Sequence, residues 1–256
     1  MEEQFAIVLK DLRKEFGSKV AVNNVNLNIE KGKLFSLLGV NGAGKTTTIR
    51  MLMGLSKPTS GEAWIMGHSI LSDLGAVKQI SNFSPQETSV APNLTVRENL
   101  EFFAKIYGAD KEQAYELVDD MIEKFSLQEV AESRAKTLSG GWQRKLSIAM
   151  AIISKPQVLF LDEPTLGLDV LARRELWKVI ERLKKEMTIV LTTHYMEEAE
   201  QLSDGIAVMV GGEIKALGTL EEIKKLTGKD SLEDAFISIA ESKFGTGDAQ
   251  GKEVTK

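Results

Sequence analysis

The sequence predicts an α/β fold with a mostly parallel core sheet, an N-terminal antiparallel β subdomain and an inserted helical subdomain. Apolar and polar residues alternate through residues 6–29, which is typical of a half-buried antiparallel sheet. Compact apolar runs at 34–38, 158–161 and 188–191 are separated by helical patterns, which indicates buried parallel strands. Between about residues 86 and 155 the strand patterns disappear and helical periodicity dominates.

The helices are predicted from their apolar spacing and from their first residues. Thr95 and Glu98 form the pattern of a capping box, in which each side chain bonds the other residue's backbone amide. A hairpin is predicted at 206–217, and a last helix begins at Ser231, with Asp234 three residues later. The other predicted helices lie at residues 46–55, 111–125, 140–153 and 171–186.

These elements predict one nucleotide-binding domain over residues 1–228, with the helical subdomain inserted at about 86–155. A C-terminal helix is expected within residues 229–244. Residues 245–256 are polar and contain glycine, so we expect them to form a disordered tail.

The composition is that of an ordinary soluble protein, with 43% hydrophobic and 27% charged residues. A net charge of -5 gives no general attraction to a polyanion, so we expect no nucleic-acid partner. The absence of cysteine excludes disulfides and thiolate metal sites. The first residues lack the pattern of a signal peptide, and no apolar run approaches the roughly 20 residues that cross a bilayer. We therefore expect a cytoplasmic protein.

The strongest local motif is GVNGAGKT at residues 39–46, which fits G-x-x-x-x-G-K-[ST] between a predicted strand and a predicted helix. In such a loop, glycines let backbone amides point at phosphates, Lys45 reaches the β and γ phosphates, and Thr46 holds Mg²⁺. A glycine-rich turn with a chance lysine is the plainer alternative, and the flanking elements argue against it. The loop alone does not separate kinases, GTPases, helicases and cassette ATPases.

A second motif is the acidic end of the apolar run at 158–161. Asp162 is placed to hold Mg²⁺, and Glu163 is placed to polarise an attacking water molecule. Taken alone, such a strand end also fits a helix cap or a solvated turn. Its position after a phosphate loop favours the catalytic interpretation.

The third motif is LSGG at residues 138–141, followed by Gln143, Arg144 and a helix. This motif resembles the signature of the ATP-binding cassette (ABC) family of P-loop NTPases. Its serine and glycines begin a helix whose amides can face a phosphate, although the chain already has one phosphate cradle. In the family, the signature of a partner completes the site, so that two ATP molecules lie between two subunits. An ordinary N-cap followed by flexible glycines is the alternative.

The resemblance covers roughly the first 220 residues and implies further site residues. Phe16 matches an aromatic residue that stacks on adenine, although a single Phe near a strand also fits ordinary core. Gln86 matches a loop glutamine that touches Mg²⁺, and His194 matches a histidine that senses the γ-phosphate. Asp169 matches a loop that crosses the dimer seam, and it also suits a helix N-cap. Trp142 departs from the family, which most often has Gln there.

The resemblance implies ATP and Mg²⁺ as cofactors and the following site. The predicted catalytic residues are Lys45, Gln86, Glu163 and His194. The predicted ATP-binding residues are Phe16, Asn41, Gly42, Gly44, Lys45, Thr46, Thr47, Ser139, Gly140, Gly141 and Asp169. The predicted Mg²⁺ ligands are Thr46, Gln86 and Asp162.

The resemblance also implies a function: the ATP-hydrolysing subunit of a membrane transporter, peripheral on the inner face of the cell membrane. Its partner is a permease on a separate chain, and its dimer is formed with a second copy or with a related subunit. Residues 86–100 and 107–108 are most similar to multidrug and lipid-type exporters. The alternative is a soluble cassette ATPase that acts on ribosomes or DNA, but the sequence lacks a second cassette, a coiled coil and zinc ligands. A regulator that does not hydrolyse ATP is disfavoured by Glu163 and His194.

Overall fold

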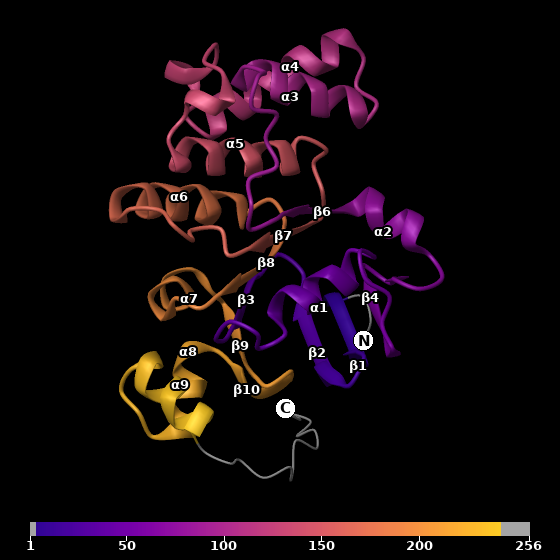
Figure 1. Ribbon diagram of the computed structural model, residues 1–256, viewed down its shortest axis with the longest axis vertical. Helices are drawn as coiled ribbons and strands as arrows, with labels where there is room; N and C mark the ends of the chain where they lie inside the picture. Colours follow the sequence, from indigo (N-terminus) through magenta and orange to yellow (C-terminus); the bar gives the residue numbers. More distant parts are fainter. Residues whose placement is uncertain (1–3, 242–256) are drawn as a thin grey trace.

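The computed structural model describes residues 4–241, which are arranged in three parts along the molecule (Figure 1). A group of helices lies at one end, two β-sheets and their covering helices lie in the middle, and two small helices lie at the other end. The predicted tail at 245–256 lies outside the described residues.

The N-terminal sheet is antiparallel, as predicted. Its four strands lie in the order β2-β1-β4-β5. Their bounds are β1 (Phe5–Phe16), β2 (Lys19–Glu30), β4 (Ser60–Ile65) and β5 (His68–Ser69). In β2, the apolar residues Val25, Leu27 and Ile29 are buried and the asparagines between them are more exposed, which follows from the period of two in a strand.

The core sheet is mostly parallel, which confirms the predicted fold class. In the part of the chain that the structure describes, six strands lie in the order β10-β9-β3-β8-β7-β6, and only the β9–β10 pair is antiparallel. Their bounds are β3 (Leu34–Leu38), β6 (Ser81–Ser84), β7 (Val158–Asp162), β8 (Thr188–Thr193), β9 (Gly205–Val210) and β10 (Glu213–Gly218).

Helices cover both faces of the core sheet. Their bounds are α1 (Lys45–Leu52), α2 (Leu74–Ile80), α3 (Val96–Ile106), α4 (Lys111–Lys124), α5 (Gly140–Ile152), α6 (Val170–Leu183), α7 (Met196–Leu202), α8 (Leu220–Thr227) and α9 (Leu232–Glu241). Two short 3₁₀ turns, η2 (Gln128–Val130) and η3 (Ala135–Thr137), precede α5.

The strand β7 shows why its sequence is continuously apolar. Leu159 and Leu161 pack into the cluster formed with α3 to α6, while Val158 and Phe160 pack into the cluster formed with α1 and the N-terminal sheet. All four side chains are fully buried because both faces of the strand are covered.

Two predicted helix starts are confirmed in detail. The Glu98 amide donates to Thr95 Oγ1 at 3.1 Å, and the Thr95 amide donates to Glu98 Oε2 at 2.8 Å, which completes the capping box of α3. The Asp234 amide donates to Ser231 Oγ at 3.0 Å at the start of α9. A cap of this kind contributes about 1 kcal/mol to helix stability.

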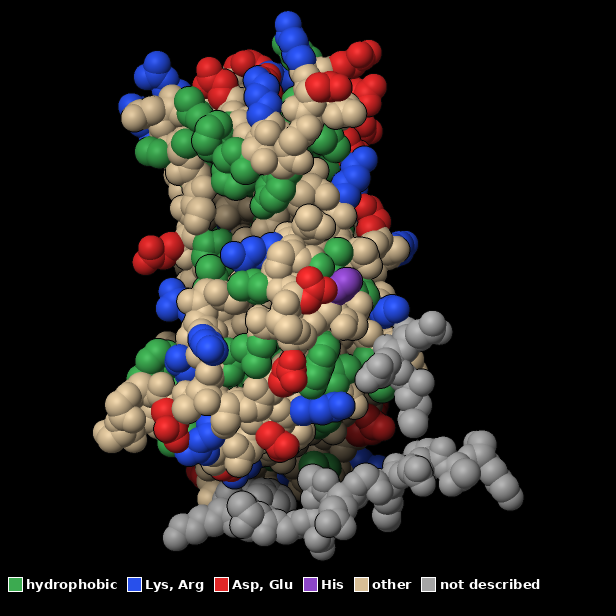
Figure 2. Space-filling model, turned by 90° about the vertical axis from the view of Figure 1, so that its right-hand side faces the viewer, with side chains coloured by type: hydrophobic (Ala, Val, Ile, Leu, Met, Phe, Trp, Pro, Cys, Tyr) green, Lys and Arg blue, Asp and Glu red, His purple; other side chains and the backbone are tan. Residues whose placement is uncertain are grey.

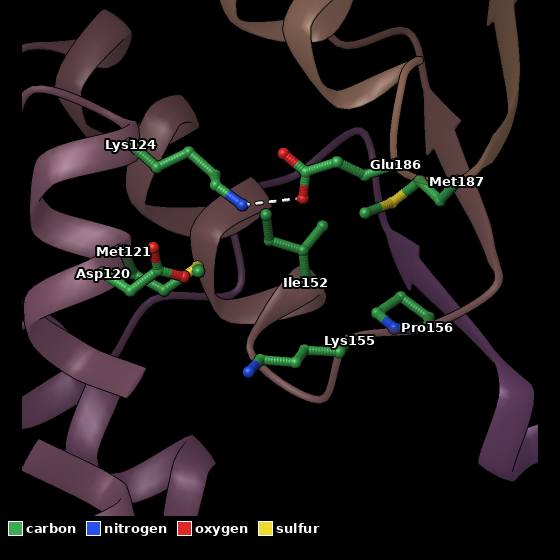
Figure 3. A pocket seen from close by; sticks show the side chains of 8 residues that line it. All are labelled: Asp120, Met121, Lys124, Ile152, Lys155, Pro156, Glu186 and Met187. Carbon is green, nitrogen blue, oxygen red and sulfur yellow. Dashed lines mark hydrogen bonds and ion pairs between the residues drawn. The ribbon is translucent and has the colours of Figure 1, made fainter. Parts of the chain in front are cut away.

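The helical subdomain rests on the core sheet through α5 and α6 (Figure 1). At its margin, Lys124 Nζ of α4 lies 2.8 Å from Glu186 Oε2, which follows α6, beside a cavity of about 140 Å³ (Figure 3). None of the residues predicted to bind ATP or Mg²⁺ lines this cavity. No helix within residues 4–241 has the length and apolar character that crossing a membrane requires.

Candidate functional site

The loop at residues 39–46 joins β3 to α1, as the motif requires. Gly42 and Gly44 have φ values of 84° and 105°, in the left-handed region that favours glycine. A Cβ on Gly44 would also lie 2.6 Å from the Ala21 carbonyl oxygen, so any side chain there would clash with β2. The loop is therefore built for a curled backbone that starts a helix, the arrangement that binds phosphate groups.

Lys45 is buried at the centre of this loop. Its Nζ donates to the carbonyl oxygens of Gly39, at 2.6 Å, and Val40, at 3.3 Å. The same atom lies 3.3 Å from Glu163 Oε1, and the lysine side chain is 4% exposed. The ammonium group therefore faces three oxygen atoms. The same N–H groups can donate to the oxygen atoms of a nucleotide phosphate.

Thr46 and Asp162 form the part of the site suited to a metal. Thr46 Oγ1 donates to Asp162 Oδ1 at 3.0 Å, and Thr192 Oγ1 donates to the same oxygen from β8. A hydroxyl and a carboxylate are the oxygen ligands that Mg²⁺ takes together with phosphates and water. These residues fit Mg²⁺, which would neutralise phosphate charge when bound. The described residues contain no cluster of three His, Asp or Glu side chains that would hold a metal without a nucleotide.

Glu163 occupies a special backbone position directly after β7. Its φ is 46°, and its amide donates to the Thr192 carbonyl oxygen at 3.1 Å and to Thr192 Oγ1 at 3.0 Å. Its Oε2 atom lies 2.8 Å from His194 Nδ1, and the side chain is 8% exposed. A non-glycine residue held in the left-handed region by neighbouring bonds is a feature of functional sites.

Gln86 is brought to the same edge of the sheet but not into contact with the metal ligands. It follows β6, which pairs in parallel with β7, with Ser84 opposite Leu161. Its side chain is exposed, and within residues 4–241 no hydrogen bond joins that side chain to Thr46 or Asp162.

The signature residues lie apart from the phosphate loop of their own chain. A Cβ on Gly140 would lie 3.9 Å from Leu168 Cδ2, and one on Gly141 would lie 3.1 Å from Ala172 Cβ. The signature therefore packs beside the start of α6. Ser139 is exposed and makes no side-chain capping bond to α5, which argues against the simple N-cap alternative.

The remaining predicted residues lie at the margin of the site. Asp169 caps α6 by accepting from the amides of Leu171 and Ala172 at 2.9 Å each. Phe16 is 54% exposed, so it is not ordinary core, and Lys14 Nζ lies 4.9 Å from its ring centroid. Asn41 is exposed, and Thr47 is half-buried at the start of α1.

Sequence reasoning missed the roles of Thr192 and Arg144. The Thr192 hydroxyl donates to Asp162 Oδ1 and accepts from the Glu163 amide. A polar residue inside an otherwise apolar buried run could have indicated this role. Arg144 donates to the backbone of Pro85 and Gln86, and no sequence pattern indicates this contact.

The loop between β3 and α1, an aspartate suited to Mg²⁺, the adjacent glutamate and histidine, and a separate signature helix are the features of an ATPase module of the cassette type. The comparisons with known proteins agree. Residues 22–166 match the model of the family described as "ABC transporter". The chain therefore belongs to the ABC transporter family.

Three relatives illustrate this membership. The human "Phospholipid-transporting ATPase ABCA3" is 44% identical over 226 residues, 87% of this chain. The Escherichia coli (strain K12) "Probable multidrug ABC transporter ATP-binding protein YbhF" is 38% identical over 239 residues, 91% of this chain. The chain spans 13% of the first and 41% of the second. A solved structure, a dimeric post-hydrolysis state of the ATP-binding cassette MJ0796 with ADP and Pi, superposes with a TM-score of 0.75 and 27% identity, over 84% of this chain and 98% of that one.

Proposed function

We propose that this chain is the ATP-hydrolysing motor subunit of a membrane exporter, and that two cassettes close around two Mg²⁺-ATP molecules to drive a separate permease. The observation that carries the proposal is that the phosphate loop and the signature pack against different elements of the same chain. The phosphate loop packs against β2 and β9, whereas the signature glycines pack against the start of α6 and the loop before it. The phosphate loop of one cassette would therefore meet the signature of a second cassette, and not the signature of its own chain.

The chemistry follows from the contacts around Glu163. In the closed pair, the γ-phosphate takes Lys45 as a partner, and Glu163 directs a water molecule at that phosphate. His194 holds the glutamate and contacts the phosphate oxygen on which charge develops. A general base of this kind contributes about 10²–10⁴-fold to the rate. Product release then reopens the pair.

The membrane partner is supported by the helical subdomain. Hydrophobic side chains gather over this part of the molecule (Figure 2). Its large exposed apolar side chains are Phe102, Ile106, Tyr107 and Tyr115. Of these, Tyr107 lines a groove of about 760 Å³ between α2, α3 and α4, and exposed apolar side chains beside a groove are typical of a protein interface. The occupant that we propose is a cytoplasmic segment of the permease, on the inner face of the cell membrane.

The cargo class is proposed from the relatives, since ABCA3 is named as phospholipid-transporting and YbhF as a probable multidrug transporter. We propose a phospholipid or a drug-like compound as the cargo class.

Co-purification tests this function directly. The tagged chain is recovered from source-cell membranes in mild detergent, and its stoichiometric partners are identified by mass spectrometry. A multi-span protein is expected, and a Phe102→Ser/Ile106→Ser variant should lose this partner while it still binds ATP. Recovery with ribosomes or DNA-repair proteins from the soluble fraction would instead refute the transporter assignment and leave the ATPase chemistry intact.

A further inference from the structure

Arg144 is a buried arginine on α5 that has no carboxylate partner among residues 4–241. Its side chain is 4% exposed. Nη1 donates to the Pro85 carbonyl oxygen at 2.7 Å, and Nη2 donates to the Gln86 carbonyl oxygen. Burial lowers the pKa of the guanidinium, while the negative charges of Asp162 and Glu198 act in the opposite direction.

If Arg144 served only to stabilise the fold, burying its charge would be costly. A buried charge without a salt bridge loses several kcal/mol of hydration, and two carbonyl oxygens recover only part of this loss. Among the described residues, the Nε atom of Arg144 also has no hydrogen-bond partner. The planar guanidinium can donate hydrogen bonds to two successive carbonyl groups at once, which no apolar residue can do.

Two other side chains of α5 also contact the segment at and after β6, but they do not bond the backbone of Pro85 or Gln86. One residue earlier, Gln143 Oε1 lies 3.5 Å from Thr88 Oγ1, and one turn later Ser147 Oγ lies 3.2 Å from Ser84 Oγ. Both contacts join α5 to the chain near β6. Within residues 4–241, Arg144 is the only side chain that bonds the backbone of Gln86.

We propose that Arg144 is a positioning residue, which fixes the Pro85–Gln86 backbone against α5 so that the Gln86 side chain is aimed at the Mg²⁺ of ATP bound to the same chain. The inference rests on the proposed function, because it requires Mg²⁺-ATP at the phosphate loop, and on the prediction that Gln86 binds the metal. The exposed Gln86 side chain is otherwise free to turn away from Thr46 and Asp162. The two guanidinium bonds fix the backbone at Pro85 and at Gln86 itself, and so limit the directions that the Gln86 side chain can take.

The test uses binding as well as turnover. In a Glu163→Gln background, the affinity for a fluorescent ATP analogue is measured as Mg²⁺ is titrated. Arg144→Met, which keeps length and loses all donors, should raise the Mg²⁺ concentration of half-maximal effect by about tenfold, the size of effect seen for groups that orient metal ligands. In a Gln86→Ala chain the same substitution should add nothing. The matched control is Ser147→Ala, which removes the neighbouring α5 contact and should leave the Mg²⁺ curve unchanged.

Several outcomes overturn the inference. An equal rise with and without the Gln86 side chain would show that Arg144 does not act through it. The same rise in Ser147→Ala would show a general loosening of α5. If Arg144→Met does not fold, Arg144→Lys replaces it, and the retained ammonium should give a rise between wild type and Gln86→Ala; an unchanged curve contradicts the proposal. A wild-type chain that fails to hydrolyse ATP would instead refute the proposed function itself.

Discussion

Oε2 of Glu163 lies 2.8 Å from Nδ1 of His194, and this contact joins the carboxyl ends of two neighbouring parallel strands, β7 and β8. The other carboxylate oxygen faces Lys45 Nζ at 3.3 Å. The glutamate is thus held between two basic groups, in a buried place where electrostatic contacts are strong. A carboxylate in this position can accept the proton of a water molecule that attacks phosphate.

Replacing Glu163 by Gln should therefore separate binding from hydrolysis. The amide keeps the size of the side chain and cannot accept a proton, so kcat should fall about 10²–10⁴-fold while ATP affinity stays within a few-fold. Single-turnover hydrolysis and equilibrium nucleotide binding measure the two effects. The control is Glu197→Gln on α7, an exposed acid, which should hydrolyse at the wild-type rate. Wild-type turnover in Glu163→Gln would remove Glu163 from the role of base.

Replacing Asp162 by Asn should abolish the dependence of nucleotide affinity on Mg²⁺. Asp162 shares its Oδ1 with the Thr46 and Thr192 hydroxyl groups, so the substitution removes charge from the metal position and leaves the loop backbone intact. We expect ATP to bind equally well in Mg²⁺ and in EDTA, with kcat lowered by more than about 100-fold. A variant that still gains affinity on adding Mg²⁺ would show that the metal lies elsewhere.

Replacing Trp142 by Gln should have little effect on turnover. Trp142 stands on the first turn of α5 with Lys145 Nζ 4.8 Å from its ring centroid, and it packs at the edge of the main core cluster. Steady-state hydrolysis within a few-fold of wild type is expected, with a small loss of stability of about 1 kcal/mol from the lost packing. Complete loss of activity would mean that the indole itself contributes to the site.

Glu198 should make stability depend on pH. It is fully buried on α7, its Oε1 accepts from Trp177 Nε1 at 3.1 Å, and burial raises its pKa above the ordinary value near 4.5. The hydroxyl groups of Thr193 and Thr165 and the charge of Arg173 offset this rise in part. The folded chain therefore keeps a proton that the unfolded chain releases, so stability falls as pH rises from about 4.5 to the raised pKa.

Urea unfolding of wild type and Glu198→Gln at pH 5 and pH 8 measures this effect. The amide carries no charge at either pH, so the variant should lose less stability than wild type between the two. As a control, Glu198→Leu leaves the Trp177 N–H without an acceptor and should lose about 1–3 kcal/mol at both pH values. Equal pH dependence in wild type and Glu198→Gln would show that this carboxyl group does not titrate differently on folding.

Sequence reasoning predicted the elements whose patterns are locally consistent. Buried runs such as β7 and β8, the capping box of α3 and the glycine-rich loop between β3 and α1 are each specified by adjacent residues, and their structures are confirmed. Lys45, Asp162, Glu163 and His194 meet because parallel strands end at one edge of a sheet. The metal-binding role of Gln86 and the adenine-stacking role of Phe16 stay predictions.

What the sequence could not predict depends on distant partners. The helices α2 and α7 have seven residues each and no side-chain cap bond, so they carry no start signal. The strand β6 reads Ser-Asn-Phe-Ser and forms because β7 offers it an edge to pair with. The hydrogen bond from Arg144 to the Gln86 carbonyl joins residues 58 apart in sequence. No local pattern encodes such a contact.

The central claim is that one ATP site is built from the phosphate loop of one cassette and the signature of another, and mixing two inactive variants tests it most directly. Lys45→Ala disables the phosphate loop, and Ser139→Arg blocks the exposed signature. Neither variant should hydrolyse ATP alone. An equal mixture should recover about one quarter of wild-type activity, because about half of random pairs are mixed and each mixed pair has one complete site. A mixture that stays inactive, beside an active wild type, would contradict the shared site.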